Sequence, residues 1–234
     1  MKLSIIIPVY HEEKNIGKVL DRIKKSVRTS HEILVLYGNS DDPTLKVLNS
    51  YLKSQKKGNI LAIQNAAKDG RRIISSIKTG LKKAKGRAVV FTMADLSDDV
   101  SQVDQMFQLI KDGSDIVCAS RYMKDGKKIG GPVIKTILSK LAGLTLYYFF
   151  KVPTHDSTNA FKMYKREIFS KINIKSTGGF EYSLEIVLKA HKKGYKITEI
   201  PTVWRDREAG KSNFKFLSWL PKYFKTYFYV FGKN

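Results

Sequence analysis

The hydrophobic positions of this chain follow two different spacings over roughly its first half. Short apolar runs rich in Ile, Val and Leu are typical of strands that are buried on both faces of a sheet. Between these runs, apolar residues recur every three or four positions, which predicts helices that each cover the sheet with one side. The expected strands lie at residues 3–10, 32–37, 59–64, 87–92 and 114–120, and the expected helices lie at residues 11–27, 44–52, 70–84 and 103–110. Strands and helices that alternate in this way form right-handed βαβ units, so the sequence predicts an α/β fold with a mostly parallel sheet.

The alternation ends after Arg121, where the composition changes. Residues 121–151 contain seven basic residues and one acidic residue, and a helical pattern places Lys135 and Ser139 on one side. Residues 141–150 carry no charge, but ten residues are too few to cross a bilayer, and the chain has no uncharged apolar stretch of 18 residues. The segment is therefore either a helix in a membrane–water interface, with its lysines at the headgroups, or an ordinary core helix.

The last residues, 213–234, form a basic aromatic tail. Residues 214–231 contain nine aromatic side chains with interleaved lysines, a composition that favours a membrane–water interface. Packing of these aromatics against the domain is the alternative, and Pro221 is expected to break or restart the helix. We therefore expect one domain at residues 1–212, with an amphipathic interface-helix insertion at residues 131–151, followed by the tail.

The composition narrows the choice of partners. The chain of 234 residues has a formal net charge of +22, which predicts a polyanionic partner such as nucleic acid, an anionic membrane surface or phosphorylated substrates. No recognisable nucleic-acid-binding module is visible, so we expect no nucleic-acid partner. The single cysteine, Cys118, allows no disulfide within the chain, which fits a reducing compartment. Met1 leads directly into a strand-like run, so we expect no signal peptide and a cytoplasmic location.

Three carboxylates, Asp95, Asp98 and Asp99, follow the buried strand at residues 87–92. Open α/β sheets bind ligands beyond the carboxyl ends of their strands, and two or three carboxylate oxygens there suit a hard divalent cation that holds a diphosphate. The alternative is a loop that caps the next helix, with Ser97 or Asp98 as the N-cap.

Five short motifs occur in a fixed order over residues 3–213. They are Ile-Ile-Pro-Val-Tyr-His-Glu-Glu at 6–13, Ala-Asp-Leu-Ser at 94–97, Ser-Arg-Tyr at 120–122, Asp-Ser-Thr-Asn-Ala-Phe-Lys at 156–162, and Glu-Ile-Pro at 199–201 with Asp-Arg-x-x-Gly-x-Ser at 206–212. Together they resemble the inverting family 2 glycosyltransferases, and within them the dolichol-phosphate mannose synthases and related polyprenyl-phosphate glycosyltransferases. The resemblance implies the GT-A fold, a three-layer sandwich with a mostly parallel sheet, plus amphipathic interface helices.

The resemblance also implies substrates and a site. It implies a nucleotide-diphosphate sugar donor, a polyprenyl-phosphate acceptor, an anionic membrane surface and Mg²⁺ or Mn²⁺. The implied donor site consists of Pro8, Tyr10, Glu12, Leu36, Gly38, Met93, Ala94, Asp95 and Ser97. The implied acceptor-phosphate site consists of Arg121, Lys135, Ser139, Arg207 and Lys211. The cation would be held by Asp95, Ser97 and Asp98, and catalysis would depend on Asp95, Arg121 and Arg207.

The chain departs from the family pattern at two places in the donor site. Met93 stands where the first Asp of an Asp-x-Asp motif is usual, so either Asp98 or Asp99 replaces that ligand or the cation is bound weakly. Gly38 lies in a segment where the family usually has an Asp-Asp pair, so a carboxylate expected to read the base or ribose is absent.

Three alternatives to this interpretation remain open. A sugar hydroxyl as acceptor would require a general base, for which Glu181 and Glu185 are the candidates, although carboxylates at the start of a helix also suit its dipole. A catalytically inactive relative that acts as a membrane adaptor is the second, and a nucleic-acid binder is the third. We favour an enzyme bound peripherally to the cytoplasmic face of a membrane.

Overall fold

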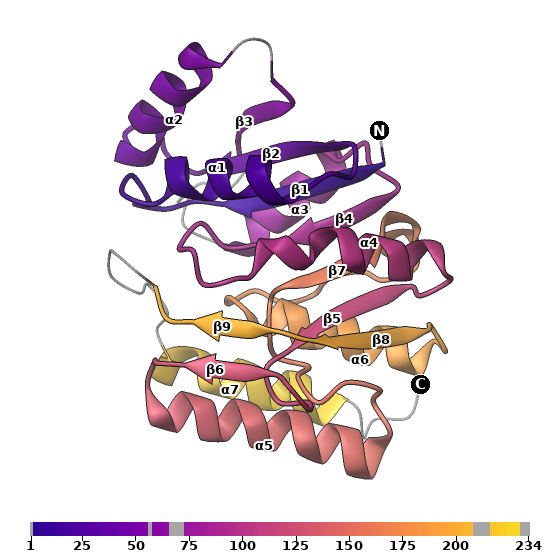
Figure 1. Ribbon diagram of the computed structural model, residues 1–234. Helices are drawn as coiled ribbons and strands as arrows, with labels where there is room; N and C mark the ends of the chain where they lie inside the picture. Colours follow the sequence, from indigo (N-terminus) through magenta and orange to yellow (C-terminus); the bar gives the residue numbers. More distant parts are fainter. Residues whose placement is uncertain (1, 56–57, 66–72, 208–215, 230–234) are drawn as a thin grey trace.

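The computed structural model describes residues 2–55, 58–65, 73–207 and 216–229 (Figure 1). Its main feature is a seven-stranded sheet in which all neighbouring strands are parallel, except that β7 runs antiparallel to both of its neighbours. In spatial order the strands are β3 (Ile60–Gln64), β2 (His31–Tyr37), β1 (Leu3–Pro8), β4 (Ala88–Phe91), β7 (Lys162–Lys165), β5 (Ile116–Ser120) and β8 (Ile197–Pro201). The predicted α/β fold with a mostly parallel sheet is confirmed.

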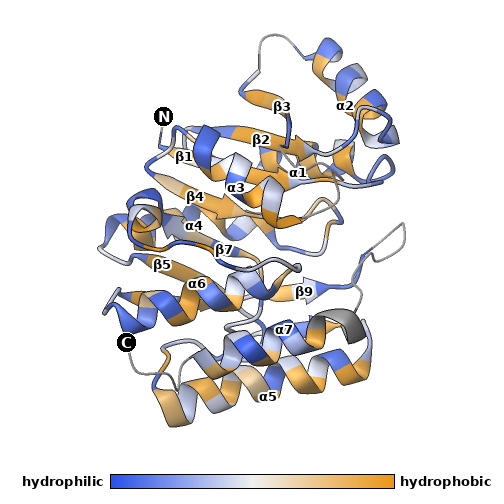
Figure 2. Cartoon of the chain, turned by 180° about the vertical axis from the view of Figure 1, so that it is seen from behind, coloured by the Kyte–Doolittle hydropathy of each residue, from blue (hydrophilic) through white to orange (hydrophobic). Residues whose placement is uncertain are grey.

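Helices cover both faces of this sheet and make three layers (Figures 1 and 2). One face packs against α1 (Ile16–Ser26), α2 (Pro43–Ser54) and α4 (Val103–Lys111), and the other packs against α3 (Ile73–Lys83) and α6 (Glu181–Lys192). Alternate residues of β1 serve the two faces: Ile5 and Ile7 lie in the first core, and Ile6 lies in the second. Each such fully buried side chain contributes about 1.5–3 kcal/mol, so this strand anchors both cores.

The remaining elements lie beside the edge strand β8. A small parallel sheet pairs β6 (Lys127–Ile129) with β9 (Val203–Arg205), and the helices α5 (Val133–Phe150) and α7 (Phe216–Phe228) run next to one another (Figures 1 and 2). The Tyr227 hydroxyl of α7 donates to the Thr145 hydroxyl of α5 (2.8 Å). Two short 3₁₀ helices, η1 (Val100–Gln102) and η2 (Arg166–Ser170), complete the described elements.

The length of α5 corrects an expectation. Its 18 residues have a mean hydropathy of 1.3, so by length and composition this helix could cross a membrane, whereas the sequence suggested that no segment was long enough. The difference arises because the uncharged run at residues 141–150 continues a helix whose earlier turns are also apolar and contain only Lys135 and Lys140 as charges. Only 11% of the residues in this helix are buried.

Three local expectations also differ from the structure. Helix α1 begins at Ile16 rather than at His11, because His11 has a positive φ of 55° and residues 11–15 form a loop. Pro221 lies inside α7 and does not interrupt it. The strands β6 and β9 were not predicted, because each has three residues and neither shows an apolar pattern.

Candidate active site

The loop after β1 is held by the start of α2. The backbone N–H of His11 donates to both carboxylate oxygens of Asp42 (3.2 Å each), and that of Glu12 donates to the Thr44 hydroxyl (2.8 Å). The Glu12 carboxylate accepts from the Asn15 amide (2.8 Å). Burial raises the pKa of Glu12, while Asn15 and Arg207 oppose the rise. The fold therefore fixes a largely buried carboxylate at the end of β1, beside the predicted site residues Pro8 and Tyr10.

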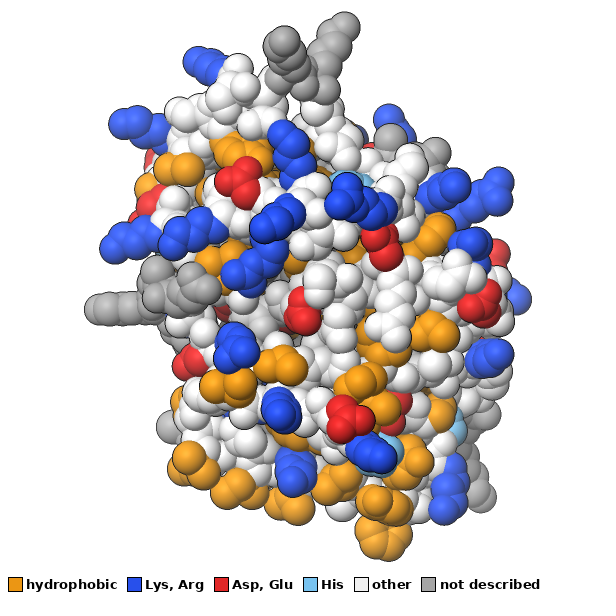
Figure 3. All heavy atoms as spheres, viewed as in Figure 1, with side chains coloured by type: hydrophobic (Ala, Val, Ile, Leu, Met, Phe, Trp, Pro, Cys, Tyr) orange, Lys and Arg blue, Asp and Glu red, His pale blue; other side chains and the backbone are white. Residues whose placement is uncertain are grey.

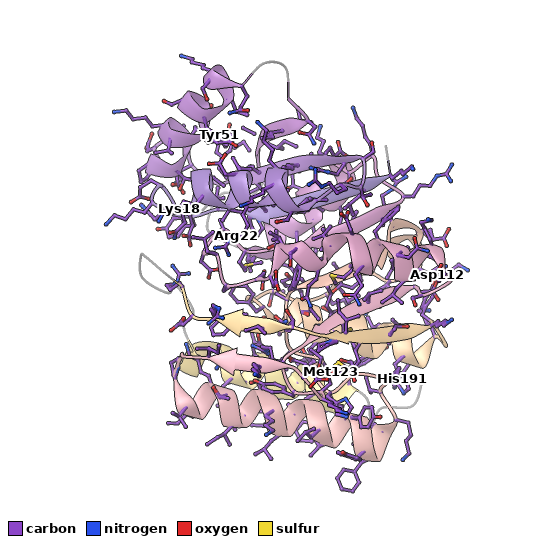
Figure 4. The ribbon with its side chains drawn as sticks, viewed as in Figure 1. Lys18, Arg22, Tyr51, Asp112, Met123 and His191 are labelled. Atoms are coloured by element: carbon purple, nitrogen blue, oxygen red, sulfur yellow. The ribbon has the colours of Figure 1, made fainter. Side chains whose placement is uncertain are left out.

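The loop after β4 presents Asp95. Its Oδ1 atom accepts from the Ser97 hydroxyl (2.6 Å) and the Ser97 backbone N–H (3.2 Å). Leu96 between them has a positive φ of 66°, which makes this tight turn possible. From the other side, Arg22 of α1 donates to the Leu96 carbonyl (3.3 Å), so α1 also holds this loop (Figure 4).

The two other carboxylates of this loop brace it. Asp98 is 6% exposed and accepts from the Thr92 hydroxyl and the Met93 backbone N–H (3.0 Å each). Burial, followed by the nearby Asp95 charge, raises the pKa of Asp98 to about 7. Asp99 caps η1 by accepting from the backbone N–H of Ser101 (3.2 Å), so the N-cap is Asp99 rather than Ser97 or Asp98.

Arg207, just beyond β9, joins the two loops. Its Nη2 atom lies 3.1 Å from Asp95 Oδ2, and its Nη1 atom lies 3.4 Å from Glu12 Oε1. Three charged residues that are far apart in the sequence therefore meet at one edge of the sheet. All three are among the predicted site residues, and their roles in binding and catalysis stay predictions.

The residues at Asp95 fit a divalent cation that is completed by its substrate. Within the described residues, no group of three or more His, Cys, Asp or Glu side chains could hold a metal by itself. Mg²⁺ is commonly bound by one or two carboxylates together with substrate phosphates and water, and Asp95 with the adjacent Ser97 hydroxyl offers such a partial site. A metal-binding role for Asp98 stays a prediction, and its described contacts are with its own loop.

The other residues predicted for the donor site differ in which of their atoms a ligand could contact. The side chains of Leu36 and Ala94 are almost completely buried, so only their backbone atoms are available to a ligand. The Gly38 carbonyl accepts from the Gln64 amide (3.1 Å). Met93 is partly exposed and donates its backbone N–H to Asp98.

Arg121 extends from the end of β5, which is separated from β4 by β7 and ends at the same edge of the sheet. Its Nε and Nη2 atoms donate to the two oxygens of Asp156 (2.6 and 2.9 Å), and its backbone N–H donates to the same carboxylate (3.1 Å). Burial alone would raise the pKa of Asp156, but Arg121 holds it below its usual range. Asp156 belongs to one of the five motifs, but its pairing with Arg121 was not predicted, because the pairing depends on β7 entering the sheet next to β5.

Helix α5 packs next to Arg121 through Tyr122. The hydroxyls of Ser139 and Tyr122 lie 2.5 Å apart, and the Arg121 guanidinium lies 5.0 Å from the centre of the Tyr122 ring. Burial lowers the pKa of Lys135, while the Asp206 charge opposes this. The predicted acceptor residues Arg121 and Ser139 are therefore linked through Tyr122. Lys211 lies outside the described residues.

The two glutamates considered as general bases are bound to the backbone. Glu181 accepts from the N–H groups of Gly178 (2.7 Å) and Gly179 (2.6 Å). Glu185 accepts from the N–H groups of Lys175 and Ser176 (2.7 Å each). Burial by itself would raise the pKa of Glu185. These bonds and those from Lys189 and the Ser176 hydroxyl outweigh it, so the pKa is lowered. Both carboxylates fasten the segment before α6, and a lowered pKa makes Glu185 a poor base.

Comparisons with known proteins agree with this geometry. Residues 4–172 match the family described as Glycosyl transferase family 2. The chain is 28% identical over 220 residues to the dolichol-phosphate mannosyltransferase of Pyrococcus furiosus, covering 92% of this chain and 60% of that protein. It is 24% identical over 211 residues to the polyprenol monophosphomannose synthase of Mycolicibacterium smegmatis, covering 89% of this chain and 79% of that protein. This chain thus spans only about three fifths of the Pyrococcus relative.

The fold is also shared with a solved structure. Glucosyl-3-phosphoglycerate synthase from Mycobacterium tuberculosis, in complex with Mn²⁺, uridine diphosphate and phosphoglyceric acid, superposes with a TM-score of 0.74 at 14% sequence identity. The match covers 100% of this chain and 79% of that one. A second structure of the same synthase contains Mg²⁺ and uridine diphosphate. At this level of identity the likeness establishes the fold, which is the expected GT-A arrangement.

Proposed function

The chain belongs to glycosyl transferase family 2, and from this premise we propose that it transfers a sugar from a nucleotide-diphosphate donor to a polyprenyl phosphate, with inversion at the anomeric carbon. The observation that carries the proposal concerns α5. This helix carries Lys135 and Ser139, Ser139 is linked to Arg121 through Tyr122, and the outer face of the helix is apolar and exposed. A phosphate that arrives on a lipid needs both a cationic pocket and an apolar surface beside it. The names of the two relatives support the same acceptor.

On the donor side, the proposed roles follow from the contacts at the strand ends. Asp95 and Ser97 would hold Mg²⁺ or Mn²⁺, which would neutralise the charge of the diphosphate leaving group. Glu12 would face the nucleotide, because the start of α2 fixes it at the end of β1. Arg207 already lies against both carboxylates and would move to the phosphate oxygens, since a guanidinium binds phosphate in a bidentate manner.

On the acceptor side, the attacking group needs no strong base, because a phosphate is already anionic. Asp156 holds the Nε and Nη2 edge of Arg121, whereas Nη1 makes no hydrogen bond within the described residues. The Nη1 atom can therefore bind the acceptor phosphate and align it with the donor. Alignment by itself lowers the barrier of a reaction between two bound substrates. A sugar hydroxyl as acceptor is less well supported, because Glu181 and Glu185 are occupied by backbone groups.

The apolar face of α5 supports peripheral attachment to the cytoplasmic face of a membrane. On one side, α5 contacts the domain along its length through Thr136, Ser139, Gly143 and Leu146. Its other side exposes Val133, Ile134, Ile137, Leu141, Tyr148 and Phe149. Apolar side chains gather at this edge of the molecule (Figure 3). A helix docked in this way would lie along a bilayer rather than cross it, and the net charge of +22 favours an anionic surface.

A transfer assay tests the proposal. The protein would be incubated with nucleotide-diphosphate sugars, with Mg²⁺ or Mn²⁺, and with vesicles that contain a polyprenyl phosphate. We expect a glycosyl phospholipid whose anomeric configuration is opposite to that of the donor. Transfer only to a sugar hydroxyl would replace the proposed acceptor, and donor binding without turnover on any acceptor would favour an inactive relative.

A further inference from the structure

Lys128, which was not among the predicted site residues, occupies a slot formed by three elements beside the proposed acceptor site. It extends from β6, its amino group donates to the Thr136 hydroxyl on α5, and it lies 5.3 Å from the centre of the Trp204 ring of β9. Gly131, with a positive φ of 78°, lies directly beside it: a Cβ at this glycine would lie 3.4 Å from the Lys128 amino group, an ordinary van der Waals contact. The lysine stem is thereby packed and its amino group is positioned.

Charged groups of both signs act on Lys128. Burial lowers the pKa of Lys128, and the charges of Arg121 and Lys135 lower it further, while Asp206 and Asp156 oppose this. Lys128 makes no ion pair within the described part of the chain. A partly buried ammonium near two other cations favours an anion in the space that they share.

We propose that Lys128 is a further binding residue for the acceptor phosphate. The inference rests on the proposed function, and it adds a further cation to that site, beside Arg121 and Lys135. A phosphomonoester carries up to two negative charges, one more than a diester. Lys128 thereby makes the site selective for a monoester, such as a lipid phosphate, over a phosphodiester of the same length.

The location of Ser139 supports this placement. Its hydroxyl accepts or donates at Tyr122 and donates to the Thr136 carbonyl (3.1 Å), so it lies between the residue that holds Lys128 and the residue that contacts Arg121. A continuous row of polar groups thus runs from Arg121 to Lys128 along the inner side of α5. A phosphate has three acceptor oxygens, so it can bind several donors of such a row at once.

The test uses a water-soluble short-chain isoprenyl phosphate, so that membrane binding does not affect the result. Its dissociation constant would be measured by calorimetry for the full chain and for Lys128→Met. We expect binding to weaken at least tenfold, while the dissociation constant of a nucleoside diphosphate with Mn²⁺ stays within twofold. The preference for the monoester over its methyl diester should fall as well.

Two controls separate binding from a structural role. Lys127→Met removes the same charge from the adjacent, exposed position of β6 and should change binding less than twofold. Thr136→Val removes the hydrogen bond to Lys128 but keeps the charge, and should have a smaller effect than Lys128→Met. If Lys128→Met folds poorly, as judged by its melting temperature, Lys128→Gln carries the same expectations.

The outcomes distinguish this inference from the proposed function. If wild-type protein binds the monoester and Lys128→Met binds it equally well, the inference is wrong and the proposed function stands. Equal weakening in Lys127→Met and Lys128→Met would also overturn it, because only the overall positive potential would then matter. If the wild-type protein binds no isoprenyl phosphate, both the inference and the proposed acceptor are wrong.

Discussion

The loops after β1 and β4 and the groups around α5 balance their charges in opposite ways. In the first region, two carboxylates, Glu12 and Asp95, share one guanidinium, that of Arg207. In the second, Arg121 has a carboxylate partner, whereas the nearby Lys128 has a hydroxyl and an aromatic ring. The first region has an excess of negative charge and suits a cation that carries a diphosphate. The second has an excess of positive charge and suits a phosphate directly.

The largest expected effect comes from removing the donor-side charge at Asp95. Asp95→Asn should lower kcat by about a thousandfold, as is typical when a group that stabilises transition-state charge is lost. The melting temperature should change little, because the side chains of Asp95 and its ion-pair partner Arg207 are both partly exposed. Asp99→Asn, which alters only the cap of η1, is the control. Near-normal kcat in purified Asp95→Asn would exclude this residue from the mechanism.

Asp156→Asn should impair use of the acceptor, because Asp156 positions Arg121. The arginine would lose its bidentate partner, so we expect about a hundredfold loss of kcat/KM for the acceptor. Breaking a buried ion pair also costs roughly 3–5 kcal/mol of unfolding free energy when one charge is left uncompensated. Urea unfolding and acceptor kinetics would measure the two effects. Asp115→Asn, which removes the partner of the half-exposed Lys165, should cost about 1 kcal/mol or less. A stability loss without a kinetic loss would make Asp156 purely structural.

Substitutions at Arg207 sharpen the comparison, because this residue bridges the donor-side carboxylates. Arg207→Ala should reduce turnover more than Arg207→Lys, and the lysine variant should still be at least about tenfold slower than wild type. A lysine supplies the charge but not the fork that contacts Glu12 and Asp95 together. Steady-state kinetics of both variants would decide this. Equal rates would mean that only the general positive potential is needed.

Substitutions on the exposed face of α5 should weaken membrane binding and leave donor binding unchanged. Changing Ile134, Ile137 and Phe149 to serine removes apolar surface that contributes about 1.5–3 kcal/mol per fully buried side chain. We expect binding to anionic vesicles to weaken by tenfold or more in sedimentation assays, and donor binding in solution to be preserved. Leu61→Ser, at another exposed apolar position, on the far edge strand β3, is the control. Unchanged sedimentation of the triple variant would refute the assignment of this face.

Asp98 is expected to have the smallest effect on activity. Its main expected effect is on the pH dependence of the free energy of unfolding. Its pKa is raised to about 7 in the folded protein, so the folded state binds more protons than the unfolded state between about pH 4 and pH 7. The free energy of unfolding should therefore fall as pH rises through this window, by roughly 2–4 kcal/mol. Asp98→Asn should flatten this dependence in metal-free buffer. Identical pH profiles of wild type and variant would show that Asp98 does not titrate in this range.

The sequence predicted the fold well where burial is continuous. The strands β1, β2 and β4 are apolar runs with both faces in the core, and such runs are visible without knowledge of their neighbours. The motifs also placed Glu12, Asp95 and Arg207 in one site. By contrast, β6 and β9 are stabilised by each other and by α5, so their short polar sequences carry no pattern of their own.

The pairing of charged groups could not be predicted, because it depends on tertiary structure. Nothing near Lys128 in the sequence indicates that Trp204 and Thr136 surround it. The aromatic tail illustrates a related ambiguity. Tyr223 and Tyr227 pack against the second core, whereas Phe224 and Phe228 are exposed. One side of α7 thus packs against the domain, and a membrane interface for its other side stays a prediction. Aromatic content alone does not separate these two faces.

The antiparallel strand β7 has a consequence for how the chain folds during synthesis. Phe91 of β4 pairs with Lys162 of β7, so one edge of β4 has no partner until the ribosome has made the whole of α5 and the loop that follows it. At about 5–20 residues per second, that edge stays open for several seconds. The chain up to α4 can pack β1, β2, β3 and β4 together, but Asp156 reaches Arg121 only when β7 closes the gap. The loops that carry Glu12 and Asp95 are thus expected to form first, whereas the Arg121–Asp156 pair and the contacts of Arg207 form later.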